Sequence, residues 1–412
     1  MKTSKNENEA AIRGIVDKRS FIFGIMAVLL CGMGFGIIAP VVPFLVKPYI
    51  LSPDEQARAV TFLTAIYALC VFLAAPGIGV LSDRYGRRPI LLISLLGSAT
   101  GYIIFGIGGA LWVLFLGRII EGFTGGIIGT LFAYFADITP KEERTKYFGW
   151  VSAAASVGVV IGPIAGGMLA KFGYSVPMFF GAIITLINFI YGYFYMPETL
   201  NKDNRLPEFT LKKLNPFTQL FSVLFMKNLT MLFLASFLIW VPNGSLQAIL
   251  SQFSIDNFQL SPAVIGLMFS IIGVQDIISQ GFIMPKLLTR LSDKKIAILG
   301  MTFEVFGYAF IGASAIFSRF PLFVVGMFLF AFGDSVFGPS FGGMISKSVA
   351  ANEQGRVQGG NQAISSFARV VGPVLGGYLY ITLGHSAPAF MGIILITAAI
   401  IVLACKARVN ES

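Results

Sequence analysis

Charged residues are scarce in this chain of 412 residues. Asp, Glu, Lys and Arg make up only 12% of it, whereas roughly a quarter of a soluble globular protein is charged. Hydrophobic residues make up 56%, and 40 Phe and 46 Gly are present, a composition that suits lipid-facing surfaces and closely packed helices. The scarcity of charge therefore excludes a soluble globular protein.

Histidine and cysteine are also rare. The single histidine, His385, cannot form a metal site alone, and we expect it in a loop between the last two apolar runs. Cys31, Cys70 and Cys405 lie in apolar stretches without the spacing of a disulfide framework, so buried free thiols are expected. The sequence contains no G-x-x-x-x-G-K-[ST] phosphate loop and no nucleophile elbow. It therefore predicts no enzyme, no metal site, no cofactor and no direct use of ATP.

Long apolar runs, in contrast, are abundant. A helix needs about 20 apolar residues to cross the roughly 30 Å of hydrocarbon in a bilayer. Twelve such runs are expected, at residues 21–45, 61–81, 90–109, 111–133, 147–170, 175–196, 228–250, 262–284, 296–317, 320–345, 357–381 and 386–405. The first run is too long for the apolar part of a cleavable signal. The sequence therefore predicts an all-α integral membrane protein with twelve transmembrane helices.

Lys and Arg are unevenly distributed among the segments that connect these runs. If the N-terminus is cytoplasmic, 24 of the 30 basic residues lie on the cytoplasmic side. The positive-inside rule then places both termini in the cytoplasm, in a multi-pass protein of the cell inner membrane. The net charge of +10 suits an anionic leaflet, and we expect no nucleic-acid partner. The exceptions are Lys47, Arg58, Lys171 and Arg319 on the opposite side, and Arg118 and Arg369 inside runs.

An internal repeat relates the fifth and eleventh runs. Residues Gly149–Gly167 and Gly359–Gly377 align without gaps at an offset of 210 residues. Duplicated halves of six spans around a central site are typical of secondary transporters, and the repeated glycines also favour close helix packing. We expect two pseudo-symmetric six-helix bundles, at 1–196 and 228–412, joined by a cytoplasmic linker at 197–227. The packing motif of the repeat comprises Gly158, Gly162, Pro163, Gly166, Gly167, Gly372, Pro373, Gly376 and Gly377.

The loop between the second and third runs carries the most specific motif, GVLSDRYGRRP at Gly79–Pro89. It resembles the G-x-L-x-D-R-x-G-R-R loop of the major facilitator superfamily. We expect a tight turn at Gly86 and Asp83 near the positive N-terminal end of a neighbouring helix. Such a cluster can latch the two bundles together as a cytoplasmic gate. The gate residues are Gly79, Asp83, Arg84, Gly86, Arg87 and Arg88.

Further segments extend this resemblance over nearly the whole chain. LGRIIEGFTGG (Leu116–Gly126) and GVVIGPIAGG (Gly158–Gly167) resemble superfamily motifs of the fourth and fifth helices, the second being associated with antiporters. ADITPKEERTKYFGW (Ala136–Trp150) and PETL (Pro197–Leu200) are family-like loops. The resemblance is to twelve-span drug/proton antiporters of the tetracycline-efflux type. It implies the major facilitator fold, export of a small molecule and a role in antibiotic resistance.

Two carboxylates of the tetracycline-efflux group have no counterpart here. Before the Met33-Gly34 pair in the first run stand Cys31 and Gly32, and in the third run Gly101 occupies the acidic position. Glu304 does match a carboxylate of the ninth helix, and Asp276 falls about where the group has a histidine. We therefore expect a drug-like or multidrug amphipathic substrate rather than a tetracycline–metal chelate.

Charged and polar side chains inside the apolar runs are candidates for the transport site. A charge at the centre of a bilayer costs about 2.5–3.5 kcal/mol or more unless it is paired or hydrated. The candidates for proton coupling or ion pairing are Arg118, Glu121, Asp276, Glu304, Asp334 and Arg369. Arg118 and Glu121 are three residues apart on one helix face, so an ion pair is the alternative role of Glu121. The candidates for a substrate cavity are Asn243, Gln247, Gln280, Gln358, Gln362 and Ser365.

The leading hypothesis is a monomeric secondary transporter that exports a small amphipathic compound in exchange for protons by alternating access. Protons suit this role because carboxylates bind and release them, and sodium is the alternative ion. Proton-linked uptake of a nutrient is the alternative function. A transport-dead sensor or a membrane enzyme is more remote.

Overall fold

The computed structural model describes residues 18–140, 143–206, 215–218, 229–349 and 354–410. Within this part of the chain, 12 helices are long and apolar enough to cross a bilayer, which confirms the predicted fold class. The first six spans are α2 (Lys18–Ile38), α4 (Pro53–Tyr85), α5 (Arg87–Ile107), α6 with α7 (Leu111–Gly125, Ile128–Ile138), α8 (Arg144–Leu169) and α9 (Val176–Tyr195). The last six are α12 (Thr230–Phe258), α13 with η4 and α14 (Pro262–Ile278, Ser279–Ile283, Met284–Leu288), α15 (Asp293–Ile316), α16 (Phe320–Lys347), α17 (Gln354–Leu383) and α18 (Ala387–Asn410).

The first span is shorter than the predicted run of residues 21–45. Helix α2 ends at Ile38, and after a turn that contains Pro40 the chain forms a separate short helix, α3 (Val42–Val46). Proline has no backbone N–H to donate and its ring clashes with the preceding turn, so it interrupts a helix that hydropathy alone would continue.

The second span begins earlier than the predicted residue 61. Ser52 caps α4, because its Oγ accepts a hydrogen bond from the backbone N–H of Glu55 at 3.3 Å. This polar first turn, which also contains Asp54, has low hydropathy although it is helical. A search for apolar runs therefore misses it.

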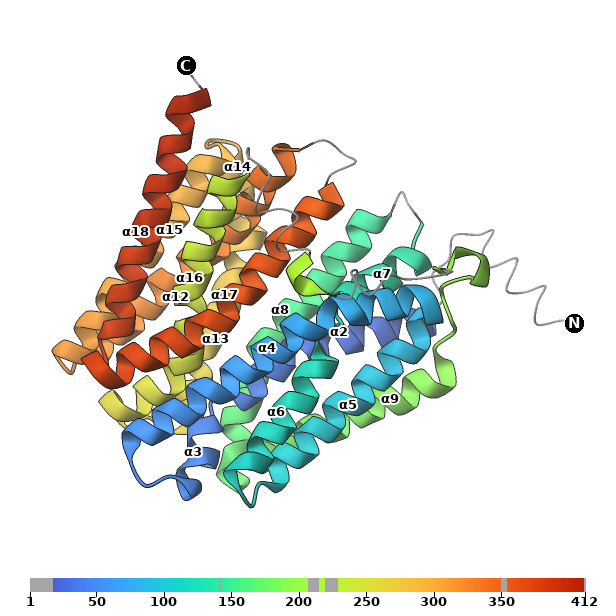
Figure 1. Ribbon diagram of the computed structural model, residues 1–412, viewed down its shortest axis with the longest axis horizontal. Helices are drawn as coiled ribbons and strands as arrows, with labels where there is room; N and C mark the ends of the chain where they lie inside the picture. Colours follow the sequence, from blue (N-terminus) through green and yellow to red (C-terminus); the bar gives the residue numbers. More distant parts are fainter. Residues whose placement is uncertain (1–17, 141–142, 207–214, 219–228, 350–353, 411–412) are drawn as a thin grey trace, which may run out of the picture.

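The helices form two bundles. In Figure 1, α2–α9 (blue to green) lie on one side and α12–α18 (yellow to red) on the other. In the N-terminal half, α2 packs on α8 and α5 packs on α6 and α9; in the C-terminal half, α12 packs on α17 and α15 packs on α16 and α18. The predicted limits of the halves and of the linker at 197–227 remain predictions, because much of that linker lies outside the described residues.

The two copies of the repeat pack in equivalent ways within their halves. In α8, a Cβ atom on Gly162 would lie 2.7 Å from the carbonyl oxygen of Met33 in α2. In α17, a Cβ atom on Gly372 would lie 2.9 Å from the backbone nitrogen of Ser245 in α12. Glycine thus allows both pairs of backbones to approach closely. The remaining motif residues share these two helices: Gly158 and Gly166 also contact α2, Gly376 also contacts α12, and Pro163 and Pro373 lie inside α8 and α17.

The halves touch at the end of the molecule that carries α3, which we call the outer end. A Cβ atom on Gly377 of α17 would lie 2.5 Å from Thr61 Oγ1 of α4, and one on Gly167 of α8 would overlap the carbonyl oxygen of Pro262 at the start of α13. Ser251 also donates a hydrogen bond to the carbonyl oxygen of Ala39 at 2.6 Å. We call these contacts between the halves the outer seam.

The opposite, inner end carries the Gly79–Pro89 motif. The structure forms it from the end of α4, the single residue Gly86 and the first turn of α5, so the predicted loop is shorter than expected. The same four helices have glycines there, Gly79 in α4, Gly359 in α17, Gly149 in α8 and Gly281 in the π-helical turn η4. A Cβ atom added to any of them would have no described atom within 4 Å, apart from its chain neighbours and the backbone of its own helix. Among the described residues, the close glycine contacts between the halves thus lie at the outer end and not at the inner end, an arrangement that we call inward-facing.

Candidate functional site

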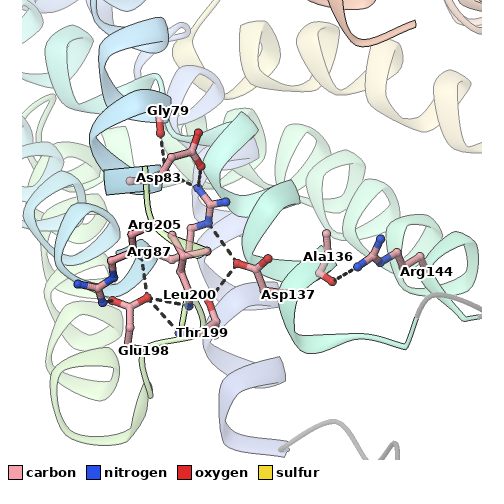
Figure 2. A network of polar contacts seen from close by, with 11 residues as sticks. Gly79, Asp83, Arg87, Ala136, Asp137, Arg144, Glu198, Thr199, Leu200 and Arg205 are labelled. Atoms are coloured by element: carbon pink, nitrogen blue, oxygen red, sulfur yellow. Dashed lines mark hydrogen bonds and ion pairs between the residues drawn. The ribbon is translucent and has the colours of Figure 1, made fainter. Parts of the chain in front are cut away.

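A polar network surrounds the loop between α4 and α5 at the inner end (Figure 2). Arg87, in the first turn of α5, pairs with Asp83 and places its Nε 3.2 Å from Asp137 Oδ2 at the end of α7. Its Nη1 also donates to Ser82 Oγ at 2.7 Å. The Arg87 side chain is 9% exposed and that of Asp83 is 42% exposed. Asp83 thus has a partner inside its own half and still faces the open inner end.

Glu198, in the segment that follows α9, completes this network. Its Oε1 accepts hydrogen bonds from the backbone N–H groups of Arg87 at 2.8 Å and Thr199 at 3.0 Å. Its Oε2 lies 3.7 Å from Arg205 Nη2. Gly86, with a φ of +108°, packs so closely on this carboxylate that a side chain there would overlap it. Glu198 therefore occupies the N-terminal end of α5.

The other gate residues have separate partners. Arg88 Nη2 donates to the carbonyl oxygen of Tyr193 in α9 at 2.6 Å, and the Arg84 guanidinium lies 5.5 Å from the centre of the Tyr85 ring. The predicted turn at Gly86 is present. Arg87 and Arg88 are thus anchored to the N-terminal half.

Glu304 is the most deeply buried acidic side chain in the C-terminal half. It lies in α15, is 0% exposed, and neither of its carboxylate oxygens has a hydrogen-bond partner within the described part of the chain. Gly333 of α16 packs on it, since a Cβ atom there would lie 2.7 Å from Glu304 Cγ. An unpartnered buried carboxylate carries a charge only at high cost, so this environment suits the neutral acid.

A hydrogen-bonded cluster adjoins Glu304 and links three helices. Asn243 of α12 is 2% exposed; its Nδ2 donates to Asp334 Oδ1 of α16 at 3.2 Å, and its Oδ1 accepts from the Tyr308 hydroxyl of α15 at 3.1 Å. Both polar atoms of Asn243 are therefore used by other helices. Asn243, a predicted cavity residue, thus contacts two other helices, which only the three-dimensional structure brings together.

Asp276 lies where the two halves meet. Its Oδ1 accepts a hydrogen bond from Nε2 of Gln280, one helical turn away, at 2.6 Å. Its Oδ2 accepts one from Ser156 Oγ of α8, in the other half, at 3.4 Å. Among the described residues, no cation forms an ion pair with it within 4 Å. Directly after it, residues Ser279–Ile283 form a π-helical turn. Such turns often occur at functional sites.

Arg118 and Glu121 form a buried ion pair in α6, as their spacing predicted. Arg118 Nη1 lies 2.6 Å from Glu121 Oε2, both residues are 3% exposed, and the guanidinium lies 4.1 Å from the centre of the Tyr67 ring. Gly101 is adjacent, because a Cβ atom there would lie 3.0 Å from Glu121 Cβ. Cys31 lines the same cavity as Glu121. Cys31 in α2 and Gly101 in α5 stand where the tetracycline-efflux group has carboxylates. Both lie beside Glu121, a carboxylate of α6.

The candidate residues on α17 are partly exposed. Gln358, Gln362 and Arg369 are exposed, and the Arg369 guanidinium lies 4.7 Å from the centre of the Trp240 ring. Ser365 is instead buried, and its Oγ donates to the carbonyl oxygen of Gln362 in its own helix at 3.0 Å. It is therefore poorly placed to contact a substrate in this arrangement.

The family model described as Major Facilitator Superfamily matches residues 24–253 and 232–411, so that the two matches together cover both halves. The chain belongs to the Major Facilitator Superfamily. This confirms the family that the Gly79–Pro89 loop and the repeat had indicated, and with it a transporter rather than an enzyme.

Several curated relatives in this superfamily cover most of the chain. The tetracycline resistance protein, class C, of Escherichia coli is 34% identical over 379 residues, which are 92% of this chain and 93% of the relative. Multidrug resistance protein 2 of Bacillus subtilis (strain 168) is 29% identical and covers 96% of this chain and 97% of its own length. A relative named as a tetracycline resistance protein and one named as a multidrug resistance protein are therefore both similar to this chain over nearly their whole length.

Solved structures share the fold at lower sequence identity. A crystal structure of the human organic anion transporter TETRAN has a TM-score of 0.72 at 21% identity and covers 94% of this chain and 99% of that one. A crystal structure of the peptide transporter POT has a TM-score of 0.79 at 15% identity and covers 95% of each chain. These similarities confirm the arrangement of the helices.

Proposed function

We propose that this protein is a secondary active transporter that exports a small amphipathic, drug-like compound in exchange for protons. The observation that carries the proposal is Glu304, a buried carboxylate without a hydrogen-bond partner among the described residues, in a chain whose relatives are tetracycline and multidrug resistance proteins. The twelve apolar helices fit a multi-pass membrane protein. We propose the inner membrane as its location, with both termini cytoplasmic, because the basic residues gather at the inner end. A monomer without nucleic-acid partners completes the proposal.

The proposed mechanism is alternating access between the two halves. The inward-facing arrangement supports it, because the glycines of the outer seam are in close contact while Gly79 and Gly359 at the inner end have room for a partner. In the outward-facing state the inner glycines would meet and the outer seam would open. The compound would enter from the cytoplasm in the first state and leave in the second.

Proton exchange would be carried by the acids of the C-terminal half. Glu304 is closed off from solvent, whereas Asp276 lies at the interface of the halves, and its hydrogen-bond partners in the described part of the chain are neutral side chains. Protonation removes a charge that is costly inside the membrane and so changes the relative free energies of the two states. The proton gradient would thereby drive export, without a further cofactor.

The proposed function is tested by expressing the gene in an efflux-deficient host. We expect lowered susceptibility to at least one compound in a panel of antibiotics, dyes and biocides that includes tetracycline and ethidium. An uncoupler should abolish the accompanying dye efflux. Efflux that persists with the uncoupler, or unchanged susceptibility to the whole panel despite normal abundance in the membrane, would contradict proton-coupled drug export.

We expect Asp83→Asn to impair transport while the abundance of the protein stays normal. In the outward-facing state the half-exposed Asp83 carboxylate would approach the N-terminus of a helix of the other half, an interaction worth about 0.3–1 kcal/mol. Its loss should shift the equilibrium between the states several-fold toward the inward-facing one. Thiol labelling from the cytoplasmic side, at Cys substituted into α4 and α17, should increase. Wild-type transport with unaltered labelling would show that the Gly79–Pro89 motif only sets the membrane orientation and takes no part in closing the inner end.

A further inference from the structure

The single histidine, His385, lies at the outer end, between α17 and α18. Its ring is stacked on that of Tyr380 in α17, with the ring centres 4.6 Å apart and the planes 7° from parallel. Tyr380 is 3% exposed, and its hydroxyl donates a hydrogen bond to Asp256 Oδ2 of α12 at 2.7 Å. Asp256 Oδ1 accepts a second hydrogen bond, from Gln252 Nε2 at 2.9 Å. An exposed imidazole is thus connected through one buried ring to a carboxylate that two donors hold in place.

The hydrogen bonds of Asn257 assign the proton on the neutral His385 ring. Asn257 Nδ2 donates to the carbonyl oxygen of Phe253, in its own helix, at 2.9 Å. Its Oδ1, which can only accept, lies 3.1 Å from His385 Nδ1. Nδ1 therefore carries the proton of the neutral ring, and Nε2 has no hydrogen-bond partner among the described residues. Because histidine becomes charged between about pH 8 and pH 5, Nε2 is the atom that can take up a proton from outside.

These residues border the outer seam. Tyr380 lies one helical turn beyond Gly377, whose backbone approaches Thr61 of α4. Asp54, which is exposed in the first turn of α4, is near enough for its negative charge to act against that of Asp256. Asp54 and Asp256 belong to opposite halves. Their repulsion therefore opposes the closed outer seam and weakens when the halves move apart.

Titratable groups reach His385 from the helices around it. Arg58, one turn beyond Asp54 in α4, forms no ion pair with Asp54 within 4 Å in the described part of the chain. The residues of α18 that line a small void beside His385, Pro388 and Ala389, carry no charge. The groups that face His385 are Asp256 of α12, Tyr380 of α17, Tyr308 of α15 and, across the seam, Asp54 of α4. None of these groups is a cation, so a proton on His385 supplies the positive charge that they lack.

We propose that His385 is an external pH sensor that controls closure of the outer seam. A proton on Nε2 places a positive charge over the Tyr380 ring, whose face attracts cations and whose hydroxyl is bonded to Asp256. This charge offsets the repulsion between Asp256 and Asp54, so an acidic exterior favours the closed outer seam. His385 stays at the outer surface and does not carry the proton across the membrane. The proposal rests on the alternating access proposed above, and it is independent of which acid carries the coupled proton.

The proton on His385 is tested by nuclear magnetic resonance of the full chain in nanodiscs. Because His385 is the only histidine, isotope-labelled histidine in a chain without a histidine tag gives a single imidazole signal. At about pH 8 the nitrogen shifts should show the proton on Nδ1, and lowering the pH to about 5 should add a proton to Nε2. A neutral ring with its proton on Nε2, or a ring that stays neutral down to about pH 5, would overturn the proposal.

The effect on the seam is tested by distances between spin labels at the outer ends of α4 and α17, in nanodiscs and without a substrate. The native cysteines are replaced, and Glu304→Gln is present throughout, so that the proposed coupling acid does not contribute to the pH response. The fraction of long distances should fall several-fold as the pH is lowered. His385→Asn should abolish this response, whereas His385→Lys, which keeps a positive charge, should give short distances at every pH.

The matched control is Asp54→Asn, which removes the opposing charge in the other half. It should also give short distances at every pH, although His385 is intact. A pH response in His385→Asn equal to that of the parent chain would overturn the sensor and leave alternating access standing. One unchanging outer distance in all variants at all pH values would refute alternating access and the sensor together.

Discussion

Replacement of Glu304 by Gln is expected to abolish substrate-dependent proton movement while the protein stays abundant in the membrane. Gln has nearly the shape of Glu but cannot bind and release a proton. Glu304 is 0% exposed and packs on Gly333, so the substitution preserves the volume of the core. A buried amide without a partner costs about 1–3 kcal/mol, which twelve packed helices can tolerate. The loss should therefore fall on coupling rather than on folding.

The measurement is the proton release from inverted membrane vesicles after addition of a compound that the resistance panel has identified. Asp276→Asn is measured in parallel, because Asp276 is the acid at the interface of the halves. The matched control is Asp293→Asn, which removes a carboxylate that pairs with Lys347 at the inner surface and should leave proton release unchanged. Wild-type proton release in both test variants would exclude both acids from the mechanism.

Much of the fold follows from local sequence, because a membrane span is defined by its own hydropathy. All twelve spans were predicted in order, and most boundaries agree within a few residues. The seventh span is an exception, because α12 continues to Phe258 rather than ending at 250. Two other misplaced boundaries have local causes that hydropathy does not detect. Ser52 begins α4 with a polar capped turn, and Pro40 interrupts the apolar run after α2. Proline and capping signals, read together with hydropathy, would have corrected both.

The sites were predicted only where the interacting residues are close in sequence. The Arg118–Glu121 pair and the Asp276–Gln280 hydrogen bond lie one turn apart on single helices, so helical spacing predicts them. Glu198, in contrast, is 111 residues from Arg87, and no local pattern indicates that it caps α5. Contacts of this kind depend on the packing of whole helices.

The cluster around Asn243 shows the same limit. Its partners Tyr308 and Asp334 lie on two other helices, 65 and 91 residues away. Hydropathy identifies each of these polar residues as costly in the membrane, but it does not indicate which of them meet. The functional interpretation of the C-terminal half therefore depends on the structure.

The substitutions Gly79→Leu and Gly377→Leu are each expected to stop transport, the first by trapping the inward-facing state and the second by trapping the outward-facing state. A side chain at Gly79 meets open space in the inward-facing arrangement, so it should fold normally and obstruct closure of the inner end. At Gly377 a Cβ atom would already lie 2.5 Å from Thr61 Oγ1, so Leu should force the outer seam apart. Overpacking costs about 1–3 kcal/mol, and a difference of that size shifts a two-state equilibrium by about 5–150-fold.

The two trapped states are distinguished by distance measurements between spin labels, one pair at the inner ends of α4 and α17 and one pair at their outer ends. Gly79→Leu should lengthen the mean inner distance and Gly377→Leu the mean outer distance, and both should lose efflux. Ala at either position should give a smaller shift in the same direction, because it adds only a methyl group. If both Leu variants lengthen the same one of the two distances, or if Gly79→Leu transports like the wild type, the inner glycines do not meet during the cycle. The hypothesis that glycine contacts form in turn at the inner and outer ends of α4 and α17 would then be wrong, even if Glu304 carries the proton.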